Sequence, residues 1–321
     1  MIARIPLRFR PYLKTVIWGG DSICEYKGIP QPEPNIGESW EVSAVPGHES
    51  VVEEGPYEGL KLSDLIDSFG PSLLGDAVFA RYGARFPLLI KLIDANDNLS
   101  VQVHPDDSLA RERHNSLGKT EMWYIIRTRE NARIYAGLSM VLTPEEYERR
   151  VRDNTLTEAL AVHEAAPGDV FYLPAGRVHA IGAGNLLAEI QENSDITYRI
   201  YDYDRRDKEG NPRELHTALA KDAIDFKVYP NYKNEPADES EACAELVSCE
   251  HFTTHRLRLD GETELKFDRR SFTVIMCVEG NATLAYASGS TIIDCGQTLL
   301  IPAVLDSLHL SGTATLLISR S

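Results

Sequence analysis

The segment "VQVHPDDS" (101–108) carries two polar side chains that can bind metal. Because alternate residues of an extended strand face the same side, we expect Gln102 and His104 to project together. Histidine is the commonest metal ligand, and glutamine offers a neutral carbonyl oxygen. An isolated Q-x-H pair is more often part of an ordinary hydrogen-bonded strand, so a metal site here needs further ligands.

Two other residues can supply such ligands. Glu121 begins the apolar run "EMWYII", where burying an unpaired carboxylate would be unfavourable. The alternative is an exposed position at the mouth of that strand. His179 ends the turn "PAGRVHA", whose proline and glycine fix the backbone that holds the imidazole.

The composition of the chain narrows the class of protein. Its 321 residues are enough for one large or two medium domains. No apolar run approaches the ~18 residues of a membrane span, and the amino terminus lacks the apolar core of a signal peptide, so we expect a cytoplasmic protein. Five cysteines without a C-x-x-C pair fit reduced thiols better than a disulfide framework.

The charge balance bears on partners. A formal net charge of −16 argues against nucleic acid and against anionic membranes as partners. An anionic small substrate remains compatible with it, because screening lets a few local cations dominate a pocket. The sequence leaves both a monomer and a homodimer open.

Most of the chain consists of short β-branched or aromatic runs closed by Gly, Pro, Asn and Asp, which predicts a mainly β sandwich or barrel. Three helical insertions are expected. In 63–71, Ser63 can cap the helix and Gly70-Pro71 end it; in 143–165, Thr143 and Glu146 form a capping box; the third helix is 214–226.

The acidic segment "DESEACAE" (238–245) predicts a linker. We therefore expect a catalytic domain over 1–245 and a smaller β domain over 246–321.

A short internal repeat relates the two parts of the chain. The segments 168–180 ("GDVFYLPAGRVHA") and 296–308 ("GQTLLIPAVLDSL") align without gaps, each with a glycine and a proline six positions apart around a strand. His179 in the first copy corresponds to Ser307 in the second. We infer two related β barrels and expect the second to bind no metal.

Four motifs, in order, resemble those of type I mannose-6-phosphate isomerases in their short bacterial form. They are "IGESWEVSA" (36–44), "LSVQVHPDD" (99–107), "GKTEMWY" (118–124) and "LPAGRVHAIGAGNLLAEIQENSDITYRIYDYDR" (173–205). The pattern around His179 also matches the second characteristic motif of the cupins. The resemblance implies two cupin-like jelly-roll β barrels with helical insertions.

Carried over residue by residue, the resemblance implies one zinc ion per chain, bound by Gln102, His104, Glu121 and His179. Nitrogen and oxygen ligands without thiolate suit zinc and leave room for sugar hydroxyls.

The resemblance also implies a cationic substrate site. Arg199, Lys119 and Asp195 are the catalytic residues, and Lys91 together with Arg199 binds the substrate. An arginine among apolar residues needs a partner, either Asp195 or a bound anion. A solvated strand edge is the alternative for Lys91. Strand alternation predicts that four residues share a face: Asp195, Thr197, Arg199 and Tyr201.

The chain departs from the longer family members, which have a histidine where it has Gly118. A proton-transfer role for that histidine is therefore in doubt here, and His114 is a candidate substitute.

The activity that the resemblance implies is interconversion of mannose 6-phosphate and fructose 6-phosphate through an enediol. The base stays open among Lys119, Asp195 and a metal-bound hydroxide. The alternatives are a non-catalytic sugar-binding or regulatory cupin with a structural metal, and an iron-dependent cupin dioxygenase. The predicted cations favour the isomerase, since a structural metal site needs none of them.

Overall fold

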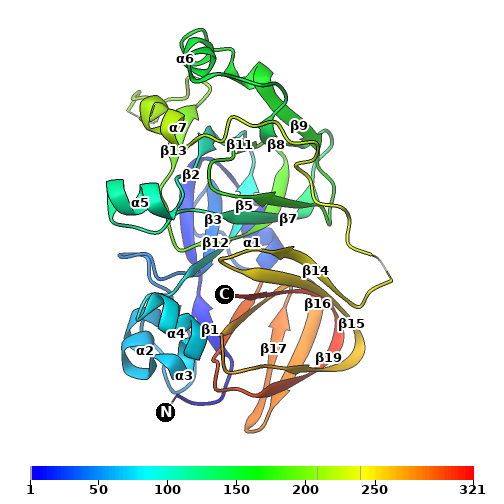
Figure 1. Ribbon diagram of the computed structural model, residues 1–321. Helices are drawn as coiled ribbons and strands as arrows, with labels where there is room; N and C mark the ends of the chain where they lie inside the picture. The colour runs from blue at the N-terminus through cyan, green and yellow to red at the C-terminus, as the bar shows by residue number, and fades with distance from the viewer. Residues whose placement is uncertain (1, 208, 239) are drawn as a thin grey trace.

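The computed structural model describes residues 2–207, 209–238 and 240–321, and β-strands dominate it (Figure 1). A six-stranded antiparallel sheet has the order β10 (Val170–Leu173), β7 (Glu121–Thr128), β12 (Asn185–Glu192), β5 (Leu88–Ala95), β3 (Ile36–Val42) and β2 (Tyr12–Gly20). A five-stranded sheet has the order β13 (Tyr198–Tyr201), β6 (Val101–Val103), β11 (His179–Ile181), β8 (Arg133–Leu138) and β9 (Leu160–Glu164).

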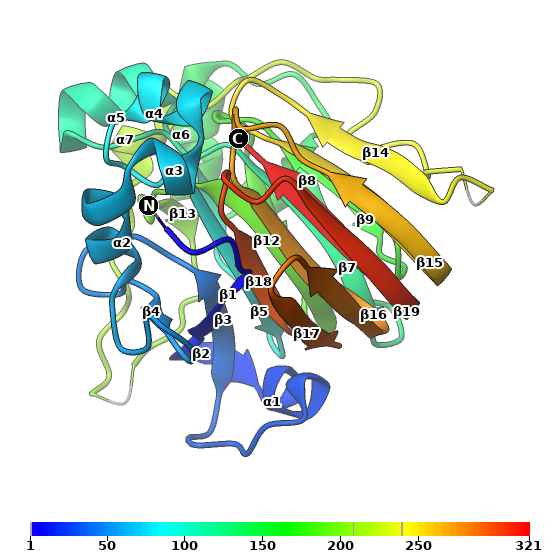
Figure 2. The same ribbon diagram turned by 90° about the horizontal axis from the view of Figure 1, so that it is seen from below.

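A third, eight-stranded sheet contains most of the carboxy-terminal part of the chain (Figure 2). Its order is β14 (Cys243–Ser248), β15 (Thr253–Lys266), β19 (Ser307–Arg320), β16 (Thr273–Tyr286), β18 (Thr298–Ile301), β1 (Leu7–Arg10) and β4 (Val51–Val52), with β17 (Gly289–Asp294) beside β16. The amino-terminal β1 is thus paired with β18, far along the chain.

The mainly β prediction is confirmed, but the two jelly-roll barrels are not. The strand pairs of the described residues give three open sheets, and none of these pairs joins the two ends of a sheet. The six- and five-stranded sheets instead share an apolar cluster that includes Trp123, Ile125 and Leu187 from the first and Ile134 and Ile181 from the second.

Strand β12 is buried along its whole length and separates two environments. Leu186, Ala188 and Ile190 belong to the core shared with the eight-stranded sheet and the helices, whereas Leu187 belongs to the cluster between the other two sheets. Because successive side chains of a strand alternate in direction, Glu189 faces the same side as Leu187.

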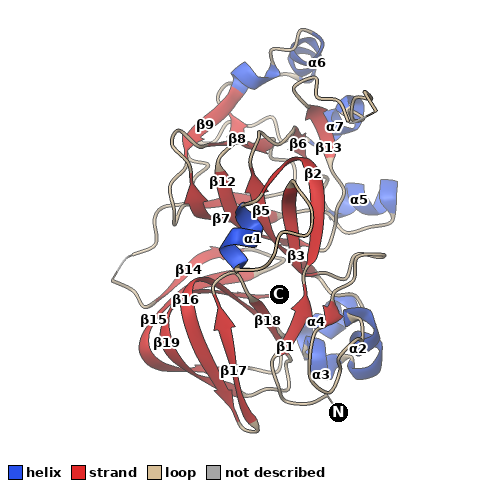
Figure 3. Cartoon of the chain, turned by 180° about the vertical axis from the view of Figure 1, so that it is seen from behind, coloured by secondary structure: helices blue, strands red, loops and turns tan. Residues whose placement is uncertain are grey.

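The helices lie outside the sheets (Figure 3). They are α1 (Ser22–Lys27), α2 (Leu62–Phe69), α3 (Pro71–Leu74), α4 (Asp76–Tyr82), α5 (Asp107–His114), α6 (Pro144–Arg152) and α7 (Thr217–Ala223), with a 3₁₀ turn at Leu156–Ala159. In the part of the chain that the structure describes, no helix is long and apolar enough to span a membrane.

All three predicted helices need correction, the third because α7 spans only Thr217–Ala223 of the predicted 214–226. The capping box of α6 is confirmed, since Thr143 and Glu146 exchange hydrogen bonds of 3.0 and 3.2 Å. The helix ends at Arg152, however, and the rest of the predicted segment forms the 3₁₀ turn and β9. The cap of α2 is Lys61 rather than Ser63, because the Asp64 carboxylate accepts from the Lys61 backbone N–H.

The predicted linker is also shorter than expected. Strand β14 begins at Cys243, inside the predicted linker, and pairs with β15. Its exposed Cys243 and Glu245 alternate with buried Ala244 and Leu246, as in a strand with one buried face. Both copies of the internal repeat span a strand, β10 in the first and β18 in the second. His179 begins the strand after β10, and Ser307 begins the strand after β18. The division into 1–245 and 246–321 stays a prediction.

Candidate metal and substrate site

A cavity of about 350 Å³ lies between the six- and five-stranded sheets. Besides Asp195, seven of the residues that line it are charged, and they lie on strands or loops around both sheets: Lys14, Glu38, Lys91, Lys119, Glu189, Arg199 and Arg213. Trp18 and Trp40 add aromatic walls, and Gln102 and Asp195 also reach the cavity. The predicted substrate residues Lys91, Lys119, Asp195 and Arg199 therefore share one cavity.

Strand register brings three of the predicted site residues together. Gln102 on β6 lies opposite His179 on β11, and on its other side it lies opposite Arg199 on β13. Paired residues of antiparallel strands have neighbouring side chains. Residues separated by up to 97 positions in sequence thus meet on one face of the five-stranded sheet.

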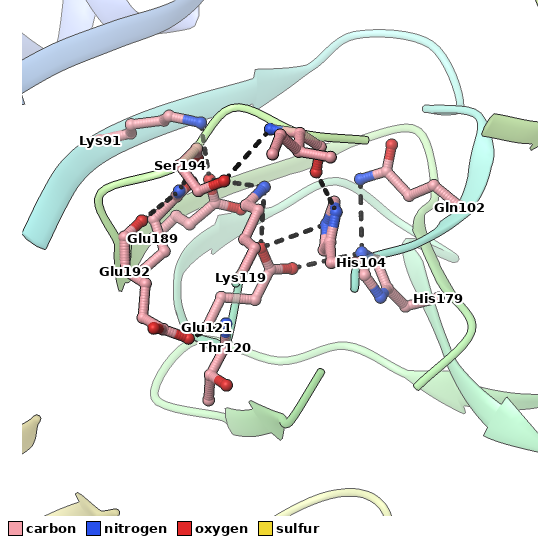
Figure 4. Close-up of polar contacts among 12 residues, drawn as sticks. Lys91, Gln102, His104, Lys119, Thr120, Glu121, His179, Glu189, Glu192 and Ser194 are labelled. Carbon is pink, nitrogen blue, oxygen red and sulfur yellow. Dashed lines mark hydrogen bonds and ion pairs between the residues drawn. The ribbon is translucent and has the colours of Figure 1, made fainter. Parts of the chain in front are cut away.

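The carboxylate of Glu121 faces the imidazoles of His104 and His179 (Figure 4). Its Oε2 is 3.6 Å from His104 Nε2, and its Oε1 is 3.3 Å from His179 Nε2. The other ring nitrogens are 2.8 Å from the carbonyl oxygens of Ile196 and Arg177, respectively, which orients the imidazoles. Glu121 Oε1 and His104 Nε2 have no hydrogen-bond partner among the described residues, although both side chains are buried, and Glu121 Oε2 is paired with the Lys119 ammonium. Unsatisfied, converging ligand atoms are typical of a metal site.

Burial fixes the charge state of these imidazoles. It lowers the pKa of His179 to about 4 and that of His104 well below its usual value. Both rings are therefore neutral at pH 7, as metal ligation requires. Burial also raises the pKa of Glu121 to about 7, against the opposing effect of the Lys119 ammonium, whose Nζ is 3.0 Å from Glu121 Oε2.

The amide of Gln102 completes the group. Its Nε2 is 3.3 Å from His179 Nε2, and its Oε1 is 3.4 Å from the hydroxyl of Ser100. Rotating the Gln102 amide by half a turn exchanges the positions of its oxygen and nitrogen, so that the oxygen faces His179. The hydroxyl of Ser100 can then accept a hydrogen bond from Gln102 Nε2. Gln102 can thus offer either atom to the centre of the group.

A buried network of charges forms one wall of the cavity. Lys91 Nζ lies 3.0 Å from Glu189 Oε1 and 3.7 Å from Glu38 Oε2, and Lys14 Nζ lies 3.3 Å from Glu38 Oε1. Burial alone would lower the pKa of Lys91, but the two carboxylates outweigh it and raise that pKa. In return Lys91 and Lys119 outweigh burial and lower the pKa of Glu189 to about 2.

Sequence reasoning missed Glu38 and Glu189. The signal available was that Glu189 interrupts the apolar run of β12 as Lys91 interrupts that of β5; the two residues lie directly opposite each other. Recognising the pair required the register of two strands far apart in the sequence.

Arg199 is half-buried at the edge of the cavity. Its Nη1 donates to the Glu214 carbonyl oxygen at 3.0 Å, and its Nε has no hydrogen-bond partner in the described chain. Asp195 and Thr197 line the same cavity, as predicted, but Tyr201 lines another one. The reason is a break in register between Arg199 and Tyr201, which ends the simple alternation of side chains.

The substitute suggested for the missing histidine faces elsewhere. His114 Nε2 is 2.8 Å from the hydroxyl of Tyr198, and His114 is not among the residues that line the cavity. Gly118 sits against the turn before α5, where an added Cβ would lie 2.6 Å from backbone atoms of Asp106 and Asp107. This loop therefore excludes a side chain at Gly118 in its present conformation.

Comparisons with known proteins agree with this geometry. Residues 7–124 match the family model of the type I phosphomannose isomerase catalytic domain, and residues 243–321 match that of the mannose-6-phosphate isomerase cupin domain. The chain is 37% identical to mannose-6-phosphate isomerase ManA of Bacillus subtilis and 32% identical to the mannose-6-phosphate isomerase of Streptococcus mutans, with 98% of each chain covered in both cases. It superposes on the crystal structure of the Bacillus subtilis mannose 6-phosphate isomerase with a TM-score of 0.89, at 36% identity over 98% of this chain and 99% of that one. The chain belongs to the type I phosphomannose isomerase family of enzymes.

Proposed function

We propose that the chain interconverts mannose 6-phosphate and fructose 6-phosphate through an enediol, with one zinc ion held by Gln102, His104, Glu121 and His179. The observation that carries the proposal is the buried Glu121 carboxylate, whose two oxygens face two neutral imidazoles beside a cavity with five cationic side chains. Family membership supports the substrate pair.

The donor set fits the ion on its own chemistry. Two imidazole nitrogens, one carboxylate and one amide oxygen match the ligands that zinc takes in sites that also bind substrate. A single carboxylate ligand leaves a site with a divalent ion net positive, which suits sugar oxygens that gain negative charge. When bound, the ion would act as a Lewis acid toward those oxygens.

Arg199 is the residue proposed to stabilise the enediolate. Its guanidinium borders the cavity, and the register places it beside Gln102. A planar guanidinium can donate to two adjacent oxygens at once, so it binds O1 and O2 best when both carry partial negative charge.

Two groups on the cavity wall can move the proton between C1 and C2. Asp195 is exposed at the cavity and, as a carboxylate, can accept a proton from carbon. Lys119 is buried beside Glu121 and, as an ammonium, can donate a hydrogen bond or a proton to a substrate oxygen. We assign the base role to Asp195 and the oxygen-side role to Lys119.

Lys91 is proposed to attract the phosphate. Its ammonium is buried with Glu189 and Glu38, so a phosphate dianion must share it with those carboxylates. Lys14, which is 38% exposed, adds positive charge at the same wall. Because carboxylates pair with these lysines, the empty cavity contains no unpaired buried charge, and the lysines can still attract a dianion.

An assay of the purified protein on mannose 6-phosphate, with fructose 6-phosphate detected by coupled enzymes, tests the function. We expect turnover that a chelator abolishes and zinc restores. Absence of turnover with zinc, manganese, cobalt or iron would instead support a non-catalytic sugar-binding protein.

A further inference from the structure

A second group of metal-ligating side chains lies away from the cavity, where the carboxy-terminal sheet meets the catalytic part. It consists of Asp107 at the start of α5, Glu192 at the end of β12 and His251 in the turn between β14 and β15. One ligand atom from each lies within 4.8 Å of the others. We propose that these three residues bind a divalent transition-metal ion, such as zinc, at this junction.

The proposal rests first on unsatisfied ligand atoms. Glu192 is 3% exposed, and its Oε1 lies 3.1 Å from His251 Nδ1. Despite this distance, neither atom has a hydrogen-bond partner within the described ranges. The two atoms thus approach each other without the alignment of an N–H···O bond. With metal–ligand bonds of about 2.0–2.1 Å, tetrahedral geometry places ligand atoms about 3.3 Å apart, close to this separation.

The same arrangement recurs in the candidate catalytic site. There, too, a buried carboxylate faces imidazole nitrogens at 3.3 and 3.6 Å, and its Oε1 has no hydrogen-bond partner in the described residues. The junction group differs in offering two carboxylates and one imidazole, and in lying at the surface of contact between sheets rather than in a cavity. Two carboxylates and one imidazole suit zinc, manganese or cobalt.

Hydrogen bonds to the backbone hold both carboxylates in place. Glu192 Oε2 accepts from the N–H of Thr120 at 2.7 Å, and Asp107 Oδ1 accepts from the N–H of Gly118 at 2.8 Å. In Glu192 this leaves Oε1 for the ion, and such second contacts orient metal ligands. The ion would therefore tie the β14–β15 turn to the backbone on both sides of Lys119.

His251 lies in the segment that was expected to bind no metal. That prediction rested on Ser307, the counterpart of His179, and did not consider a ligand shared with residues of the other part of the chain. The competing interpretation of the group is an ion pair between protonated His251 and Glu192.

The metal content of the 321-residue chain distinguishes a metal site from an ion pair. The protein is stripped with a chelator, titrated with zinc chloride, desalted, and analysed for zinc per chain. We expect two ions for the wild type, one for His251→Ala, one for His179→Ala and none for the double variant. His309→Ala is the matched control: this exposed histidine lies 3.5 Å from Glu262, and we expect its loss to leave two ions.

A milder variant guards against misfolding of His251→Ala. Asp107→Asn keeps an oxygen for the Gly118 N–H but removes a ligand charge, and we expect it to weaken zinc binding at the junction by about 100-fold. In the His179→Ala background, zinc should raise the melting temperature by a few degrees, and Asp107→Asn should remove that rise.

One zinc per wild-type chain, lost in His179→Ala, would overturn the proposal and leave an ion pair only. Two ions retained in both His251→Ala and Asp107→Asn would overturn it as well. Loss of one ion in His251→Ala with none lost in His179→Ala would support the junction site and count against the ligands proposed for catalysis.

Discussion

Replacing Glu189 by glutamine removes one charge from the buried network and changes its shape little. Glu189 is 4% exposed; its Oε1 lies 3.0 Å from Lys91 Nζ and 4.0 Å from Lys119 Nζ, and its Oε2 accepts from Trp123 Nε1 at 2.9 Å. Removing one partner of a buried ion pair lowers the free energy of unfolding by about 3–5 kcal/mol. We expect Glu189→Gln to reach the lower end of this range at pH 7. In the variant, Lys91 still has Glu38 as an ion-pair partner, and Lys119 still has Glu121.

The pKa of Glu189 gives a second figure for the same effect. Burial opposes ionisation, but Lys91 and Lys119 lower that pKa from the usual 4.5 to about 2. At about 1.36 kcal/mol per pKa unit the difference is about 3 kcal/mol. Because the pKa is lower in the folded state, this stabilisation is fully present above pH 4.5 and is lost as the pH falls toward 2.

Urea denaturation of wild type and Glu189→Gln, at pH 7 and at intervals down to pH 3, measures the difference. We expect about 3 kcal/mol at pH 7 and a smaller gap in acid. Glu264→Gln is the control, because Glu264 forms an exposed pair with Lys266 at 3.3 Å and such pairs contribute little. In the double variant with Lys91→Met the losses should be less than additive. A loss below about 1 kcal/mol at pH 7, or a gap independent of pH, would refute the reasoning.

Further variants test the site and its loop. His179→Ala should lose the zinc ion at Glu121, as measured by metal content, and full retention would remove His179 from the ligands. In steady-state kinetics Arg199→Ala should lower kcat and kcat/KM together by about two powers of ten, because it removes a charged contact of the transition state, and a near-normal kcat would contradict this. Lys91→Ala should chiefly raise KM, and a fall in kcat at unchanged KM would speak against a role at the phosphate. Gly118→Ala should lower the free energy of unfolding by about 1–3 kcal/mol, because the added Cβ would clash with the backbone of Asp106. Gly289→Ala is the control, since an added Cβ there makes only ordinary van der Waals contacts.

The candidate site was predictable where local patterns determine it. Strand alternation was sufficient to place Gln102 and His104 on one side, and the turn before His179 was recognisable from its proline and glycine. The motifs of the family then indicated that Glu121 belongs with them. All four residues do lie together in the structure.

What the sequence could not provide is the pairing between distant strands. Glu189 meets Lys91 only because β12 and β5 adopt one particular register, and local patterns do not encode that register. The break in register after Arg199, which turns Tyr201 away, is likewise a property of the pair β13–β6. Whether strands close into barrels depends on pairing at the sheet edges, so mainly β content was predictable and closure was not.

The pairing of β1 with β18 has a consequence for synthesis of the chain. Leu7 lies opposite Leu300, so the ribosome must add about 290 residues after the first strand before its partner exists. At roughly 5–20 residues per second this interval is about 15–60 s. Throughout it, β1 presents one unpaired edge while the six- and five-stranded sheets, whose strands all precede Tyr201 or end there, can already assemble. Among the strands of this structure β1 is thus made first and completed among the last, and until β18 is made its unpaired edge is open to chaperones and to mispairing.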